Sequence, residues 1–344
     1  MSNVIVVHPK FDFSWPWTAD HLHALWQAQG QVEFIRLSPD DTRTLAEILP
    51  NPGEVTRLVS LMAPVTPDCL RSFTGLREIS IMTGSTYRSK LPEELEQVLT
   101  EAGVQIRAQP NEGYWGQSVS EFALALTICG LRRIPQTHHE MITSLAPWNY
   151  DPADGIGRPH TRGEQFGDDP NFANGNIAGK RIRIVGAGNI ASRYASFVHM
   201  IGADVAAWDP YASEPSFHRA GARREYHLEQ LVKDAEIFVP MVPLLDSTRG
   251  LITAELIRAL PKGCLVVLAT RAKICDVDAI RERVLNDEIS LAADVFDIEP
   301  LPLDDPLLGR HNVVHTPHNA GRTIESNYRW AERLAEQFTP IPAV

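Results

Sequence analysis

The chain contains little cysteine, an excess of acid over base, and no hydrophobic run approaching the roughly 20 residues that a membrane helix needs. Its four cysteines, Cys69, Cys129, Cys264 and Cys275, lie far apart without metal-ligand spacing, which predicts reduced core thiols and no metal site. The 43 acidic residues outnumber the 32 lysines and arginines, and the net charge of −11 argues against a nucleic-acid partner. Residues 1–10 lack the features of a secretory signal, so we expect a cytoplasmic protein without a membrane partner.

Short runs of β-branched and aliphatic residues alternate with helical patterns, and the 344 residues suffice for two globular cores. In the first part of the chain, these runs predict strands over residues 4–7, 32–37, 57–62, 76–82 and 104–108. In the second part, they predict six strands over residues 181–185, 204–208, 237–242, 265–270, 290–295 and 312–316. The fold class is therefore α/β.

The two sets of strands predict two domains. The second set suits a doubly wound Rossmann domain over residues 116–318. The first set predicts a smaller flavodoxin-like α/β domain over residues 1–115, which residues 319–344 complete because the helical tail at 326–337 is too short to form a domain. A polar stretch over residues 148–179 indicates an extended surface loop.

A glycine motif follows the predicted strand at residues 181–185. Gly186 permits a tight turn, Gly188 lets the backbone approach a pyrophosphate, and Ala191 replaces a third glycine. Because the motif lies between a strand and a helix, the turn, including Asn189 and Ile190, predicts a dinucleotide site. Glycines that serve backbone geometry alone are the alternative.

The strand predicted over residues 204–208 ends at Asp209. An acidic residue at this distance from the glycines accepts hydrogen bonds from the diol of an adenine ribose, and its charge repels a 2′-phosphate. The sequence therefore favours NAD over NADP. A strand-end aspartate in an ordinary turn is the alternative.

Each of the last three predicted strands is followed by a polar residue that can take part in catalysis. These residues are Arg271, Glu299 and His318. The carboxyl ends of parallel strands share one edge of a sheet, so we expect these side chains in one crevice. A guanidinium can hold a carboxylate by two hydrogen bonds, and a histidine beside a carboxylate is a competent proton donor and acceptor. Taken alone, Arg271 is equally well a surface residue, and a lone histidine after a strand is more often structural.

The run from Gly186 to Gly321 resembles the D-isomer-specific 2-hydroxyacid dehydrogenases, a family that includes glyoxylate/hydroxypyruvate reductases and phosphoglycerate dehydrogenases. The matching segments are residues 186–191, 208–211, 242–252, 271–280, 294–300 and 316–321. They occur in the order that the family has.

The resemblance implies an NAD-dependent oxidoreductase that interconverts a 2-keto acid and a D-2-hydroxy acid by hydride transfer. It implies the catalytic set Arg271, Glu299 and His318, in which His318 is the acid and base and Arg271 also orients the substrate. A glutamine would stand in place of Glu299 in the formate dehydrogenases, so a formate activity is not expected.

The resemblance also implies further binding residues. It places cofactor contacts at Pro243, Thr248, Thr270 and Asp294, of which Asp294 holds the nicotinamide carboxamide. The substrate carboxylate is expected on the turn after residues 76–82, at Gly84 and Ser85. The apolar helix over residues 118–131 is either core or a subunit contact, and the resemblance favours a homodimer through it.

Two positions depart from the family pattern. Leu268 replaces a typical asparagine and Ala272 a typical glycine on either side of Arg271. These departures leave open a catalytically degenerate dehydrogenase. An NAD(H)-sensing scaffold similar to the C-terminal-binding-protein corepressors is a further alternative, since such proteins keep the fold and the residues.

Overall fold

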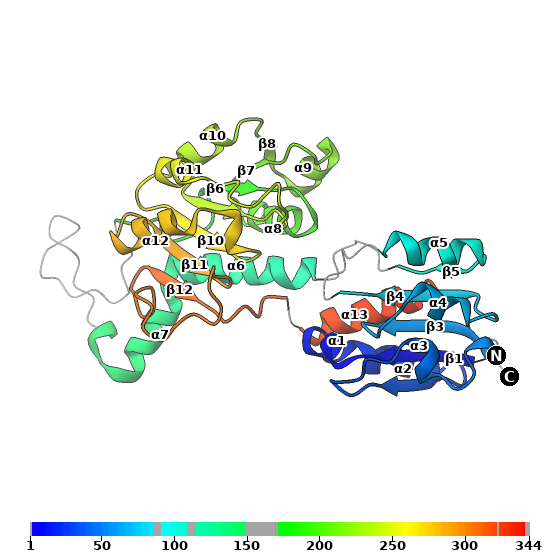
Figure 1. Cartoon of the computed structure of the whole chain (residues 1–344). Helices are drawn as coiled ribbons and strands as arrows, with labels where there is room; N and C mark the ends of the chain where they lie inside the picture. The colour runs from blue at the N-terminus through cyan, green and yellow to red at the C-terminus, as the bar shows by residue number, and fades with distance from the viewer. Residues whose placement is uncertain are drawn as a thin grey trace, which may run out of the picture. The chain divides into compact units, whose positions relative to one another are not determined.

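The computed structural model describes residues 2–84, 91–108, 115–148, 169, 171–321 and 323–340, and the chain divides into two compact units (Figure 1). The first unit comprises Met1–Tyr114 and Arg322–Val344, and the second comprises Trp115–Gly321. Each unit contains its own parallel sheet. Among the described residues, no helix is long and apolar enough to cross a membrane. Most of the predicted polar loop at 148–179 lies outside the described residues.

All neighbouring strands of the first sheet run parallel, in the order β2-β1-β3-β4-β5. This is the strand order of flavodoxin-like folds, as the sequence predicted. The strands are β1 (Ser2–Val7), β2 (Glu33–Arg36), β3 (Val55–Leu61), β4 (Glu78–Met82) and β5 (Gln105–Ile106).

Helices cover both faces of this sheet. One face packs on α3, α4 and α5, and α2 packs on β1 and on the helix near the C-terminus, α13. Trp330 of α13 lies edge-on to Phe11, with ring centroids 5.5 Å apart, and Thr18 donates a hydrogen bond to Asn327. The predicted helical tail therefore belongs to the first unit. The helices are α1 (Pro9–Ser14), α2 (Thr18–Gln27), α3 (Leu45–Ile48), the 3₁₀ turn η1 (Pro52–Glu54), α4 (Pro67–Arg71), α5 (Glu93–Glu101) and α13 (Ile324–Ala335).

The second sheet is also parallel, in the order β12-β11-β10-β9-β6-β7-β8. Six of its strands match the prediction, and the seventh, β8, was missed because two arginines carry no hydrophobic pattern. The strands are β6 (Arg181–Val185), β7 (Asp204–Trp208), β8 (Arg223–Arg224), β9 (Ile237–Pro240), β10 (Leu265–Leu268), β11 (Ser290–Ala293) and β12 (Val313–His315).

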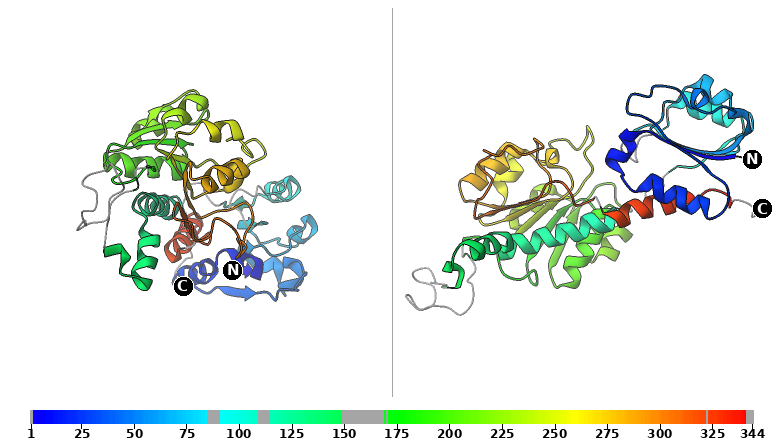
Figure 2. Two further views of the ribbon diagram at one scale, coloured as in Figure 1. Left: turned by 90° about the vertical axis from the view of Figure 1, so that its left-hand side faces the viewer. Right: turned by 90° about the horizontal axis from the view of Figure 1, so that it is seen from below.

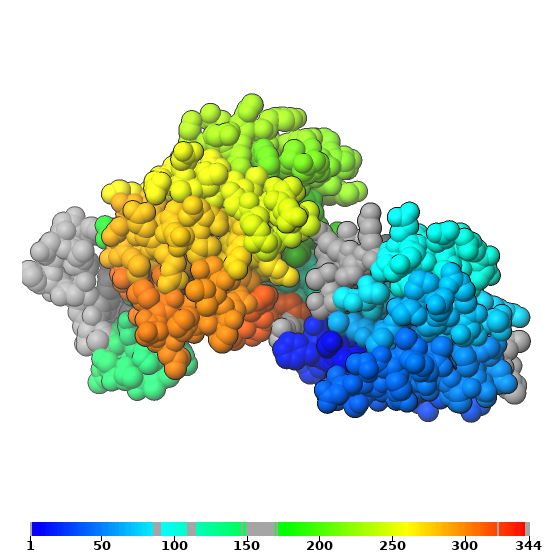
Figure 3. All heavy atoms as spheres, in the orientation of Figure 1, coloured from blue at the N-terminus to red at the C-terminus, as the bar shows by residue number. Residues whose placement is uncertain are grey.

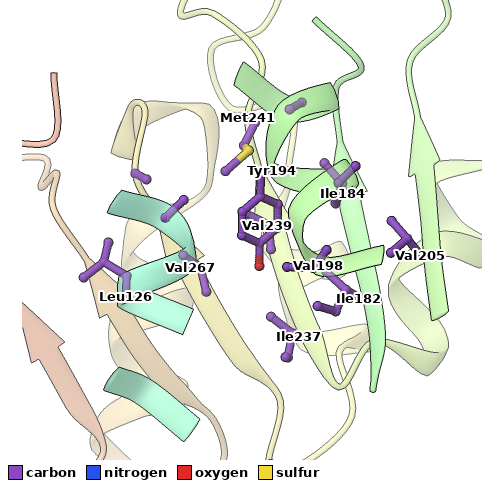
Figure 4. Packing of buried hydrophobic residues seen from close by; sticks show 14 of the residues in the cluster. Leu126, Ile182, Ile184, Tyr194, Val198, Val205, Ile237, Val239, Met241 and Val267 are labelled. Atoms are coloured by element: carbon purple, nitrogen blue, oxygen red, sulfur yellow. The ribbon is translucent and has the colours of Figure 1, made fainter. Parts of the chain in front are cut away.

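This sheet lies between two layers of helices, as both views in Figure 2 show. Side chains from alternate strand positions point to opposite faces. On one face, strand residues such as Ile184 and Val239 pack with Leu126 and Tyr194 from the helices (Figure 4). The helices are α6 (Gly116–Arg132), α7 (Ile134–Thr143), η2 (Ala146–Trp148), α8 (Asn189–Met200), α9 (Glu214–Ala220), α10 (Leu228–Leu231), η3 (Val232–Asp234), α11 (Ala254–Ala259), η4 (Ala272–Ile274) and α12 (Val277–Leu285).

Candidate cofactor and active site

The glycine motif forms the turn between β6 and α8, where the strand order of the second sheet reverses. Gly186 has a φ of +114°, and a Cβ there would lie 3.3 Å from the backbone carbonyl of Met241. A Cβ on Gly188 would meet nothing within 4 Å, so the space beside this backbone is open. Gly188 is the N-cap of α8, and no side chain of this residue caps the N–H groups at the start of the helix. The turn, with Asn189 and Ile190 in the first turn of the helix, therefore fits a pyrophosphate.

Asp209 directly follows β7, and its carboxylate holds the glycine turn. Oδ2 accepts a hydrogen bond from the Ala187 N–H at 2.8 Å, and Oδ1 accepts from the N–H groups of Tyr211 and Ala212 at 2.9 and 3.1 Å. A carboxylate has about four acceptor positions, so Oδ2 can accept one further hydrogen bond. The arrangement fits a ribose hydroxyl better than a second anion.

Three other predicted cofactor contacts follow β9 and β10. Thr248 Oγ1 donates to the Pro243 carbonyl at 2.5 Å and accepts from the Leu245 N–H at 2.8 Å, so this hydroxyl is used within its own turn. Thr270 is buried, and its Oγ1 lies 3.3 Å from the Pro240 carbonyl oxygen. These side chains shape the loops, and their contact with a cofactor stays a prediction.

Arg271, Glu299 and His318 lie beyond the carboxyl ends of three adjacent strands, β10, β11 and β12. The segments that carry them run from yellow-orange to orange-red in Figure 3, and they adjoin on one face of the second unit. The strand order thus brings together at one edge residues that are far apart in the sequence.

Glu299 and His318 form a direct pair. His318 Nδ1 lies 2.7 Å from Glu299 Oε2, and the other oxygen, Oε1, accepts a hydrogen bond from the Phe296 N–H at 2.8 Å. His318 has a φ of +54°, which is uncommon for a residue other than glycine. The two side chains are 39% and 35% exposed, so solvent and small molecules reach both.

The ionisation of Glu299 fixes the roles of the two imidazole nitrogens. Burial opposes the charge, but hydrogen bonds from His318 and the Phe296 N–H, together with the charges of His318 and Arg271, outweigh it and lower the pKa of Glu299. The carboxylate is therefore ionised at neutral pH, and Nδ1 donates its proton to it. Among the described residues, Nε2 has no hydrogen-bond partner, which leaves it available for proton exchange.

Arg271 is exposed, whereas its neighbours in the sequence are not. Its Nη1 donates a hydrogen bond to the Thr270 carbonyl at 2.6 Å, and its positive charge helps to lower the pKa of Glu299. Leu268 and Ala272 are 4% and 3% exposed and pack in the core cluster on the α11 and α12 face of the sheet. The two departures from the family pattern therefore fill the core beside Arg271 without covering it.

Asp294 is completely buried, and its carboxylate organises the segment that contains His318. Oδ1 accepts from the Thr316 hydroxyl at 2.6 Å and from the Asn319 N–H at 3.0 Å, and Oδ2 accepts from the Ala320 N–H at 2.9 Å. These three hydrogen bonds lie on both sides of His318. The predicted contact of Asp294 with the nicotinamide stays a prediction, whereas its structural role was not predicted.

The predicted substrate turn belongs to the first unit. Gly84 follows β4 closely and is partly buried, and Ser85 lies outside the described residues. Sequence reasoning missed the hydroxyl of Thr316 and the N–H of Phe296, which hold Asp294 and Glu299. A threonine two positions before the candidate histidine was the one available signal, because short hydroxyl side chains commonly bond to nearby acceptors.

Comparisons with known proteins agree with this geometry. The family model of the D-isomer specific 2-hydroxyacid dehydrogenase NAD binding domain matches residues 156–320. The D-3-phosphoglycerate dehydrogenase of Methanocaldococcus jannaschii is 28% identical over 243 residues, which are 70% of this chain but only 42% of that protein. The glyoxylate reductase of Thermofilum pendens is 28% identical over 306 residues, covering 86% of this chain and 80% of that protein.

Solved structures show the same fold. A phosphoglycerate oxidoreductase from Rhizobium etli superposes with a TM-score of 0.72 at 19% identity, covering 96% of this chain and 92% of that one. The second unit is thus an NAD-binding Rossmann domain. The family model, which matches residues 156–320, and these relatives support the D-isomer specific 2-hydroxyacid dehydrogenase family for this chain.

Proposed function

We propose that the protein is an NAD-dependent oxidoreductase that interconverts a small 2-keto acid and a D-2-hydroxy acid. The observation that carries the proposal is the 2.7 Å pair of His318 with an ionised Glu299, on the same sheet edge as Arg271. A proton donor, a residue that orients it and a cation for the substrate are the groups that this reaction requires.

In the proposed reduction, His318 Nε2–H donates its proton to the carbonyl oxygen of the substrate as C2 accepts a hydride. NADH, when bound, supplies that hydride from its nicotinamide ring. Glu299 accepts the Nδ1–H hydrogen bond throughout, which keeps the imidazole oriented. In the reverse direction Nε2 takes the proton from the hydroxyl group.

Arg271 is proposed to hold the substrate. Its guanidinium uses one N–H on the Thr270 carbonyl and has further N–H donors for the carboxylate and the reacting oxygen. The first unit is proposed as the substrate domain, with Gly84 and Ser85 on the binding turn. Asp209, which already carries a negative charge at the ribose position, favours NAD over NADP.

The test is the loss of NADH absorbance on mixing the protein with 2-keto acids from glyoxylate and hydroxypyruvate to phenylpyruvate, repeated with NADPH. We expect oxidation of NADH by at least one acid, giving the D-isomer of the product. Arg271→Ala should lower kcat/KM by about 10²-fold or more, because one well-placed transition-state donor contributes that much. Arg271→Lys keeps the positive charge but loses the planar guanidinium with its paired N–H donors, so it should retain part of the original kcat/KM.

No turnover across the panel despite NADH binding would contradict the proposal, and would favour a sensing scaffold or a degenerate dehydrogenase. If Arg271→Ala left the rate unchanged, the proposed role of Arg271 would be wrong, but the proposed reaction would stand.

A second copy of the chain is the proposed partner. The ten-residue helix α7 buries none of its side chains, and the segment from it to η2 exposes Met141 (52%), Ile142 (71%), Leu145 (77%) and Trp148 (59%). So many large apolar side chains on one short segment are typical of an association surface. The preceding helix α6, predicted as core or contact, buries one face that includes Val119, Ala123 and Leu126, whereas Ile128 on this helix is 37% exposed.

Ile142→Asp combined with Leu145→Asp should weaken this homodimer at least tenfold, because both changes place a charge in an apolar contact. Light scattering during size exclusion, over a range of protein concentrations, measures the shift from dimer to monomer. Leu303→Asp is the matched control, since Leu303 is 97% exposed elsewhere on the second unit. The assignment would be refuted if the protein without substitutions were a monomer. It would also be refuted if the double variant formed a dimer with the same affinity.

A further inference from the structure

The second unit contains a cavity of about 70 Å³ at the edge of its sheet opposite to the candidate active site. It lies where β11 and β12 begin, beside Ser290 and Asn312, whereas the catalytic candidates follow the carboxyl ends of the strands. The end of α6, the first turn of α7 and residues 172–174 form its other walls. A cavity of this size exceeds the roughly 10–15 Å³ that one water molecule needs, so a compact ligand fits.

Arg133 joins α6 to α7 and lines this cavity. Its φ of +51° places the backbone in the left-handed region, which is uncommon for a residue other than glycine. Its Nε is buried and has no hydrogen-bond partner in the part of the chain that the structure describes. No carboxylate in that part forms an ion pair with its guanidinium. A buried cationic N–H without an acceptor costs free energy, so it needs a partner.

Gln136, in the first turn of α7, adds the complementary atom to the cavity. Its Nε2 donates to the carbonyl oxygens of His311 and Val313, at 3.3 and 2.8 Å. These two acceptors fix the orientation of the amide, because a flipped amide would place Oε1 against two other oxygens. Oε1 is buried and accepts no hydrogen bond from any described residue. The cavity is therefore lined by one residue with an unused donor and one with an unused acceptor.

Asp169 contributes a carboxylate to the same lining. Its Oδ1 accepts hydrogen bonds from the backbone N–H and from Nδ2 of Asn171, at 2.9 and 3.0 Å. A carboxylate has about four acceptor positions, so Asp169 can accept further hydrogen bonds. Within the described ranges, no basic side chain forms an ion pair with it. Arg133 and Asp169 thus place a positive and a negative group on one cavity without neutralising each other.

A ligand with both a carboxylate and an ammonium group satisfies these three side chains at once. A water molecule can bridge the two unused atoms, but it neutralises neither charge. An inorganic anion supplies no donor for the amide oxygen of Gln136. We infer that this cavity binds a small α-amino acid as its zwitterion. The carboxylate accepts from the guanidinium of Arg133, and the ammonium group donates to Gln136 Oε1 and to the carboxylate of Asp169.

The volume and the apolar lining limit the side chain of this amino acid. Leu131, Phe172, Ala173 and Val314 supply the apolar lining. The cavity has about half the volume of the roughly 150 Å³ cavity that holds benzene, so a large side chain does not fit. We therefore expect glycine and alanine as ligands. Neither has a keto or hydroxyl group at C2, so the site does not depend on the proposed reaction.

The experiment titrates the full chain with glycine and with L-alanine. Calorimetry measures the binding, and the ¹H–¹⁵N resonance of Arg133 Nε reports its hydrogen bond. We expect saturable binding of both amino acids with a shift of this resonance. Acetate lacks the ammonium group and methylammonium lacks the carboxylate, so each should bind at least tenfold more weakly.

Two results of this titration would overturn the inference. Acetate that binds as tightly as glycine would mean that the cavity accepts an anion and not a zwitterion. No binding of either amino acid at high millimolar concentration would mean that water alone occupies the cavity.

Two variants remove the unused atoms one at a time. Arg133→Gly removes the guanidinium, and glycine adopts the φ of +51° without strain. It should weaken glycine binding about tenfold or more with little change in Tm, since a hydrogen bond between charged groups is lost. Gln136→Lys keeps a donor for the carbonyls of His311 and Val313 but removes the acceptor, so it should also weaken binding. Arg219→Ala is the matched control, because it removes the same charge from an exposed position on α9.

Two further measurements separate this site from the proposed reaction site and from the proposed dimer. Arg271→Ala removes any carboxylate bound at the reaction site, and glycine binding should persist in this variant. Loss of binding there would assign the signal to the reaction site and overturn the inference. Light scattering of Arg133→Gly checks association, because α7 also carries the proposed dimer surface. If this variant dissociated the dimer but still bound glycine, Arg133 would serve the second copy rather than a ligand, and the inference would be wrong.

Discussion

Replacing His318 by glutamine should lower kcat by about 10²–10⁴-fold, the usual contribution of a positioned general acid and base. Glutamine places an amide near the position of Nε2, so it can still donate a hydrogen bond, but it cannot transfer a proton at neutral pH. The affinity for NADH should change little, because the glycine turn and Asp209 lie at other strand ends. Stopped-flow and steady-state rates with the best 2-keto acid, together with NADH titration by fluorescence, measure both quantities.

His315→Gln is the matched control, since His315 is an exposed residue at the end of the same strand and does not pair with Glu299 among the described residues. It should retain the rate of the unchanged protein. Equal losses in the two variants would indicate a general disturbance of this strand end, and an unchanged rate in His318→Gln would remove this residue from the mechanism.

The pH profile of the same rates tests the role of Glu299. Its pKa is lowered in the folded chain, so the carboxylate remains charged through neutral and mildly acidic pH. A lowered folded pKa means that the ionised pair supports the fold above the unfolded pKa, and that this support is lost as pH falls through the folded value. Glu299→Gln should therefore lower the rate near neutral pH and weaken its decline on the acid side.

The strands could be predicted from the sequence because each buried strand is a run of apolar residues bounded by polar turns. The prediction also placed Arg271, Glu299 and His318 at one sheet edge, since parallel strands put their carboxyl ends together. The sequence ranges differ from the structure mainly at strand ends, as with 265–270 against β10, which ends at Leu268. Ala269 and Thr270 remain buried after the strand pairing has stopped, so burial extends the predicted range.

Other features depend on contacts that no local pattern carries. The helix α7 was not predicted, because it exposes apolar side chains rather than burying one face. The cavity beside Arg133 is lined by residues from separate parts of the chain, and only the folded domain brings them together. Asp294 likewise meets Thr316, Asn319 and Ala320 only after β11 and β12 have paired.

Asp294→Ala should reduce both stability and turnover, because it removes the one carboxylate that holds both sides of His318. Three buried or partly buried donors, on Thr316, Asn319 and Ala320, lose a charged acceptor. We expect the free energy of unfolding of the second unit to fall on the order of 3–5 kcal/mol. Urea unfolding measures this change, and the rate per folded molecule measures the displacement of His318.

Asp294→Asn separates this positioning role from a direct contact with the nicotinamide. The amide oxygen can still accept from two of the donors, but its NH₂ group faces the third, so we expect a loss of about 1–3 kcal/mol. Asp304→Ala, at an exposed site in the following loop, should change neither stability nor rate. If Asp294→Asn raised the KM for NADH while leaving stability and kcat intact, the carboxylate would act on the cofactor rather than on His318. A fall in kcat together with stability, at unchanged NADH affinity, is the outcome that the three hydrogen bonds predict, because they act on the backbone that carries the acid and base.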